Sequence, residues 1–104
     1  MKVNKLLIDT MQEWLQEKYL QLNYHLHLYL IGSILISEQI NDVDIVILIK
    51  IDKQEIKTFA ISQIDIKKDF LNKFNLKLHI TSFTDNEIIE FKKFMSINNF
   101  LKLI

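Results

Sequence analysis

Gly32 and Ser33 end one apolar run of the sequence, and Asp42 and Asp44 open the next. Successive side chains of a strand point to opposite faces, so the two aspartates are predicted to share a face. Paired carboxylates suit a hard cation such as magnesium. A Gly-Ser turn offers backbone N–H groups and a hydroxyl to phosphate oxygens. These residues therefore favour metal-assisted binding of a phosphorylated ligand.

This order of residues resembles the polymerase-beta-like nucleotidyltransferase superfamily, and within it the small minimal nucleotidyltransferases. That family carries Gly-Ser, a short spacer and Asp-x-Asp between two strands. The resemblance implies that Asp42 and Asp44 are catalytic and bind Mg²⁺ or Mn²⁺, and that Gly32 and Ser33 bind the phosphates of a nucleoside triphosphate. The implied activity is transfer of a nucleoside monophosphate to an unknown acceptor.

The chain departs from the family pattern after the Gly-Ser and on the next strand. After the Gly-Ser, relatives carry an arginine and a second glycine. This chain lacks the arginine, and Ser37 stands in place of the second glycine. The third family carboxylate is expected on the strand that contains Lys77 and His79, and lysine occupies its position. A lysine would repel a second metal ion, and imidazole is not a preferred magnesium ligand. We therefore regard Lys77 and His79 as modulators of the site.

Three interpretations follow. The intact Gly-Ser and Asp-x-Asp favour a nucleotidyltransferase. The missing arginine, the missing glycine and Lys77 favour a catalytically decayed relative that acts as an antitoxin-like or scaffolding module, with a toxin-like protein as its partner. The third interpretation is an unrelated α/β domain in which an acidic strand end arises by coincidence.

Composition limits the class of protein. The chain has 104 residues, of which 49% are hydrophobic, which predicts one folded domain over 1–104. Its 13 basic residues, all lysine, balance 13 acidic ones, so there is no strong nucleic-acid signal. Cysteine is absent, which excludes disulfides and thiolate metal sites. Neither a signal peptide nor a membrane span is apparent, so we expect a cytoplasmic protein without membrane association.

Hydrophobic periodicity predicts the order of the elements. Helices are expected at 3–23, 53–74 and 84–95, strands at 24–31, 42–51 and 76–81, and a short helix or turn at 33–39. The second helix allows a break near Ile66, and Thr84 with Glu87 matches a capping box. This is an α/β (α+β) chain with a small, mixed, three-stranded sheet and helices mainly on one face, as in a nucleotidyltransferase palm.

The last residues form an apolar tail: Phe100, Leu101, Leu103 and Ile104. They are predicted either to close the core or to contact another chain. Together with an open sheet face, the second alternative indicates a homodimer or a complex with a protein partner.

Overall fold

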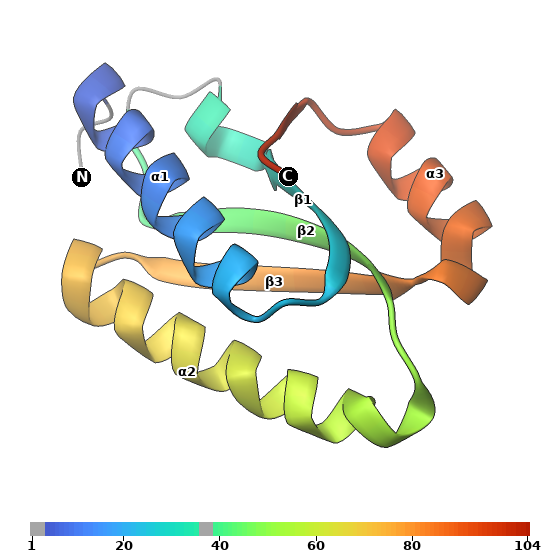
Figure 1. The fold of residues 1–104 in the computed structure, drawn as a ribbon. Coiled ribbons are helices and arrows are strands. Elements are labelled where there is room, and N and C mark those ends of the chain that lie inside the picture. Colours follow the sequence, from blue (N-terminus) through green and yellow to red (C-terminus); the bar gives the residue numbers. More distant parts are fainter. Residues whose placement is uncertain (1–3, 36–38) are drawn as a thin grey trace.

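The structure, a computed structural model, describes residues 4–35 and 39–104. Helices and strands follow one another in the predicted order, with short 3₁₀ turns (η) between them (Figure 1). The elements are α1 (Lys5–Gln21), β1 (His25–Ile31), η1 (Gly32–Leu35), β2 (Asp42–Lys50), η2 (Lys53–Glu55), α2 (Ile56–Phe74), β3 (Lys77–Thr84), η3 (Asp85–Glu87), α3 (Ile88–Ser96) and β4 (Phe100–Lys102).

Polar side chains define the ends of the helices. Asn4 caps α1, since its Oδ1 accepts a hydrogen bond of 2.8 Å from the backbone N–H of Leu7. Asn75 ends α2 in the left-handed region at φ 55°, a conformation that asparagine tolerates better than most residues. The predicted capping box is confirmed, because Thr84 N donates to Glu87 Oε1 over 3.0 Å ahead of α3.

The sheet is mixed and has four strands in the order β3-β2-β1-β4. β2 pairs antiparallel with β1 and parallel with β3, and β4 pairs antiparallel with β1. The prediction of three strands is wrong because β4 comprises only the three residues Phe100–Lys102, too few for an alternating pattern to be recognised. Leu103, just beyond it, is buried in the core, so part of the apolar tail closes the core.

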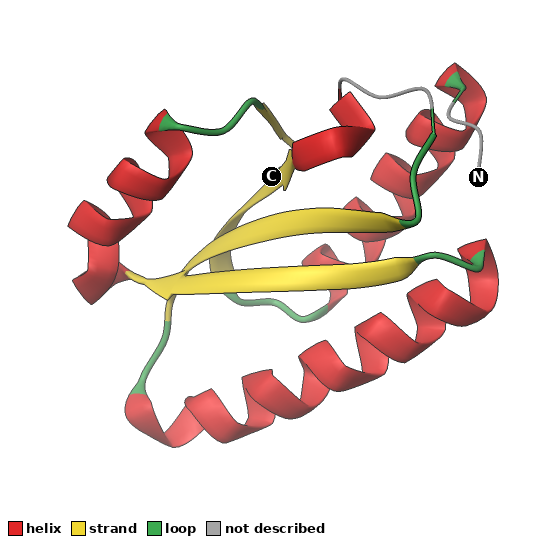
Figure 2. Cartoon of the chain, turned by 180° about the vertical axis from the view of Figure 1, so that it is seen from behind, coloured by secondary structure: helices red, strands yellow, loops and turns green. Residues whose placement is uncertain are grey.

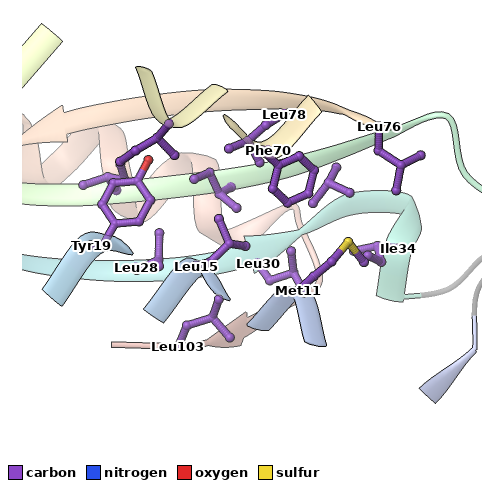
Figure 3. Close-up of a cluster of buried hydrophobic side chains, with 14 of the residues drawn as sticks. Met11, Leu15, Tyr19, Leu28, Leu30, Ile34, Phe70, Leu76, Leu78 and Leu103 are labelled. Atoms are coloured by element: carbon purple, nitrogen blue, oxygen red, sulfur yellow. The ribbon is translucent and has the colours of Figure 1, made fainter. Parts of the chain in front are cut away.

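The main core lies between the sheet and the pair of helices α1 and α2. Alternate residues of β1 and β2, among them Leu28 and Ile45, point into it, as the predicted strand alternation requires. Trp14 of α1 packs edge-on against Phe70 and Phe74 of α2, with ring centroids 5.6 and 5.9 Å apart. Figure 3 shows side chains of both helices meeting those of the strands in this cluster.

The opposite face of the sheet carries α3. Ile31 and Val46 form a second buried cluster with Phe91 and Met95 of α3. Figures 1 and 2 show α3 apart from α1 and α2, so the helices lie mainly on one face, as predicted. Asp42 and Asp44 precede Val46 on the same side of β2 and do not belong to this cluster.

Two predicted boundaries are wrong. β3 continues to Thr84 rather than ending at residue 81, because Ser82, Phe83 and Thr84 also pair with β2. α2 is continuous through Ile66, which is buried against the core, so the predicted break does not occur. The short helix or turn predicted at 33–39 is confirmed in its first part as η1, which covers Gly32–Leu35, and residues 36–38 of that prediction lie outside the described residues.

Candidate functional site

The site is built where β1 ends beside the start of β2. Ile31, the last residue of β1, pairs with Asp44 in the antiparallel register. The next residue, Gly32, has a φ of +84°, a backbone conformation that residues other than glycine rarely adopt. This conformation turns the chain out of the sheet and into η1.

Gly32 also lies against the carboxylate of Asp44. A Cβ atom added to Gly32 would sit 2.8 Å from Oδ2 of Asp44, closer than real Cβ atoms approach a heavy atom. The absence of a side chain therefore serves two purposes at this position, namely the turn and the contact. The predicted proximity of the Gly-Ser turn to the acidic pair is confirmed for Gly32 and Asp44.

The environment of Asp44 disfavours its charged form. Burial raises the pKa of the Asp44 carboxyl above its usual value, His79 opposes this rise, and the negative charge of Asp42 adds to it. The influence of Asp42 agrees with the prediction that both aspartates lie on one face of β2. A carboxylate that is half-buried beside a second carboxylate is a favourable position for a cation.

The parallel register of β2 and β3 brings Lys77 and His79 to the same region. Asp42 is the Cα partner of Lys77, and Asp44 is the Cα partner of His79. His79 Nε2 lies 3.0 Å from Asp42 Oδ2, and both side chains are about half exposed. The imidazole thus contacts one aspartate by a hydrogen bond and faces the other across the strands.

The acidic donors for a metal ion in this region are the two aspartates. Among residues 4–35 and 39–104, no group of three or more His, Cys, Asp or Glu side chains could hold a metal ion. Magnesium is nevertheless bound in many proteins by one or two carboxylates together with substrate phosphates. The donor set of Asp42 and Asp44 fits one such ion when a phosphorylated ligand completes its coordination.

One predicted phosphate contact, the hydroxyl of Ser33, lies outside the described residues, because only the backbone of Ser33 belongs to the described part of η1. Ser37, which replaces the second glycine of the family pattern, also lies outside them. Sequence reasoning missed the hydrogen bond between His79 and Asp42. Its only signal was the presence of both residue types on neighbouring strands, because the bond depends on the register between them.

Comparisons with known proteins add no relative. No family model, no curated protein and no solved structure matches this chain significantly. None of the helices in the described ranges combines the length and apolarity of a bilayer-spanning segment. The geometry of the site is therefore the ground on which a function can be argued.

Proposed function

We propose that this chain is a nucleotidyltransferase-like protein that binds a nucleoside triphosphate and one divalent cation at Asp42 and Asp44, beside Gly32. The contact between Gly32 and Asp44 Oδ2 is the observation that carries the proposal. It brings the turn at Gly32 against one carboxylate of the Asp42–Asp44 pair. Phosphate oxygens and a cation need these two features side by side.

The local energetics support a functional origin for this contact. Burial of the Asp44 carboxyl, which raises its pKa, makes the charged form of this group unfavourable in the folded chain. Carboxyl groups with perturbed pKa values are concentrated at functional sites. A cation at the carboxylates would stabilise the ionised form of Asp44 and remove part of this cost.

In this site the chain's own residues bind and orient the ligand. Asp42 and Asp44 would supply carboxylate oxygens to Mg²⁺ or Mn²⁺, and the cation would lie between these oxygens and the phosphates near Gly32. The cation, when bound, would neutralise phosphate charge. Lys77, the register partner of Asp42, is placed to add a further positive charge.

A second candidate is a non-catalytic module that binds a protein partner. His79 Nε2 already lies 3.0 Å from Asp42 Oδ2. Lys77, the Cα partner of Asp42, occupies the position at which the nucleotidyltransferases that this chain resembles carry a third carboxylate. Both features leave the site with fewer anionic donors than two metal ions need. We therefore expect nucleotide binding with little or no transfer to a generic acceptor.

The proposal is tested by titrating a non-hydrolysable nucleoside triphosphate into the protein by calorimetry, with Mn²⁺ or Mg²⁺ present. Binding should be lost in Asp42→Asn/Asp44→Asn. It should be kept in the control Asp65→Asn/Asp69→Asn, which makes the same charge change at exposed positions of α2. Equal affinity in the wild type and the site variant would refute the proposed site.

Transfer distinguishes the two candidates. The wild type is incubated with an α-labelled nucleoside triphosphate and a generic acceptor, and the label on the acceptor is counted. Brisk labelling that Asp44→Asn abolishes would establish an active enzyme. Nucleotide binding without labelling would support the non-catalytic candidate.

A further inference from the structure

β3 is an edge strand with one paired side. In the sheet order β3-β2-β1-β4, its neighbour within the described residues is β2. The free N–H and C=O groups of an edge strand are a template for one more strand. Extended peptides bind many proteins in this way, with main-chain hydrogen bonds for affinity and side-chain pockets for specificity.

A groove runs between this edge and α2, and its part near the C-terminal half of β3 is apolar. A hollow of about 390 Å³ lies there, lined among others by Ile56, Ala60 and Ile64 of α2 and by Ile80 of β3. Ile56 and Ile64 are 47% and 66% exposed. Contact with apolar side chains of a partner would remove these surfaces from water.

The other part of the groove is basic. A second hollow of about 290 Å³ is lined by Lys67, Lys68, Leu71, Lys77, Leu78 and His79. Lys67 borders both hollows, so they adjoin along β3. Among the described residues that line them there is no aspartate or glutamate. The lysines that line this part of the groove favour an anionic occupant and disfavour a second copy, which would bring its own lysines to the pairing edge.

We propose that the groove between β3 and α2 binds an extended acidic segment of another protein, which adds to β3 as an antiparallel strand. Antiparallel pairing is the commoner arrangement. It places the first half of the segment beside Ile80, and alternate side chains of this half should be apolar. The second half lies beside Lys67 and Lys68, and alternate side chains of that half should be acidic. The groove shares Lys77 and His79 with the surroundings of Asp42 and Asp44, but this proposal does not rest on nucleotide binding there.

The probe is a labelled synthetic peptide of the order Val-Thr-Val-Thr-Glu-Thr-Glu-Thr with blocked ends, titrated with the full chain by fluorescence anisotropy. Three control peptides isolate the interactions. One replaces both glutamates by lysine, one reverses the order of residues, and one carries N-methyl groups on alternate amides to remove the main-chain hydrogen bonds. We expect the first peptide to bind most tightly and added salt to weaken it.

Charge reversal in the protein gives the decisive result. Lys67→Glu/Lys68→Glu should lower the affinity for the glutamate peptide by about tenfold or more and raise the affinity for the lysine peptide. The matched control Lys92→Glu/Lys93→Glu reverses two exposed lysines on α3 and should change neither affinity. If circular dichroism shows that the charge-reversed variant does not fold, Lys67→Gln/Lys68→Gln tests the loss of the two positive charges instead.

Four results would overturn the proposal. They are equal affinity for the glutamate and lysine peptides, no effect of N-methylation, and tighter binding of a single-stranded oligonucleotide than of the peptide. The fourth is a dimer in sedimentation equilibrium that excludes the peptide, because it would assign the edge of β3 to a second copy.

Discussion

Oδ2 of Asp44 lies where a side chain on Gly32 would have to sit, since a Cβ atom there would be 2.8 Å from that oxygen. Gly32 also has φ +84°. Gly32→Ala should therefore lower the free energy of unfolding by about 1–3 kcal/mol through backbone strain and the clash together. Urea unfolding followed by circular dichroism measures the difference.

The clash and the strain are separable in a double-mutant cycle. In the background Asp44→Ala the oxygen is gone, so Gly32→Ala should cost less there, with the positive φ alone remaining. If alanine costs the same in both backgrounds, the contact with Asp44 contributes nothing and backbone conformation explains the whole effect.

Asp44 predicts a pH dependence of stability. Burial raises its pKa in the folded chain above the ordinary value of 3.8, so between these two values the folded state binds more protons than the unfolded state. Stability contributed by this group is thus present below 3.8 and is lost as the pH rises through the folded pKa. Asp44→Asn should be more stable than the wild type at neutral pH and gain nothing in acid.

Urea midpoints at neutral pH and at about pH 3 test this expectation for Asp44. The control is Asp42→Asn, which removes an exposed partner of His79, a type of pair that contributes only about 0–1 kcal/mol. A loss of stability in Asp44→Asn at neutral pH would mean that the charged carboxylate supports the fold.

Local pattern was enough to predict much of the fold and the core of the site. Strand alternation placed Asp42 and Asp44 on one face, and the single glycine marked the turn beside them. The capping box at Thr84 was likewise readable, because its partners lie within one turn. The shared face of the two aspartates and the capping box depend on residues close in sequence, where backbone geometry determines which side chains meet.

Features that depend on distant pairing were not predictable. The bond from His79 to Asp42 requires the register between β2 and β3, which non-local contacts determine. Lys67 and Lys68 lie exposed on α2, and their position beside β3 depends on how α2 lies across the sheet. β4 was not predicted for the same reason, since its three residues form a strand only by pairing with β1.

Lys77 predicts how the site responds to charge. It is the Cα partner of Asp42, and its ammonium opposes a cation bound at the carboxylates. Lys77→Glu should strengthen Mn²⁺ binding by about tenfold or more, since a repulsive charge becomes an attractive one. Titration of Mn²⁺ by electron paramagnetic resonance gives the affinity, with Lys102→Glu as a control on the exposed strand β4.

Lys77→Glu also shows whether Lys77 binds the phosphates of the nucleotide or only repels the metal ion. If the lysine binds phosphate directly, Lys77→Glu will weaken nucleotide binding in the absence of a divalent ion. If it only repels the metal, nucleotide binding with Mn²⁺ will increase. Unchanged Mn²⁺ affinity in Lys77→Glu would show that the lysine does not influence the carboxylate pair.

A buried hydrogen bond links α1 to α2 beneath the groove. The hydroxyl of Tyr19, which is 1% exposed, donates to Gln63 Oε1 over 2.5 Å, and Gln63 lines the apolar hollow beside β3. Figure 3 shows Tyr19 within the main core. Tyr19→Phe would leave the Gln63 oxygen unsatisfied, so we expect a loss of about 1–3 kcal/mol in the free energy of unfolding.

The pair should be strongly coupled, because each partner satisfies the other in a buried place. Gln63→Met alone should also destabilise, since it leaves the Tyr19 hydroxyl without its acceptor. Tyr19→Phe/Gln63→Met replaces both polar groups by apolar ones of similar shape and should recover most of the loss. Additive costs in the double variant would show that packing of the two side chains, rather than the hydrogen bond, holds α1 against α2 at this point.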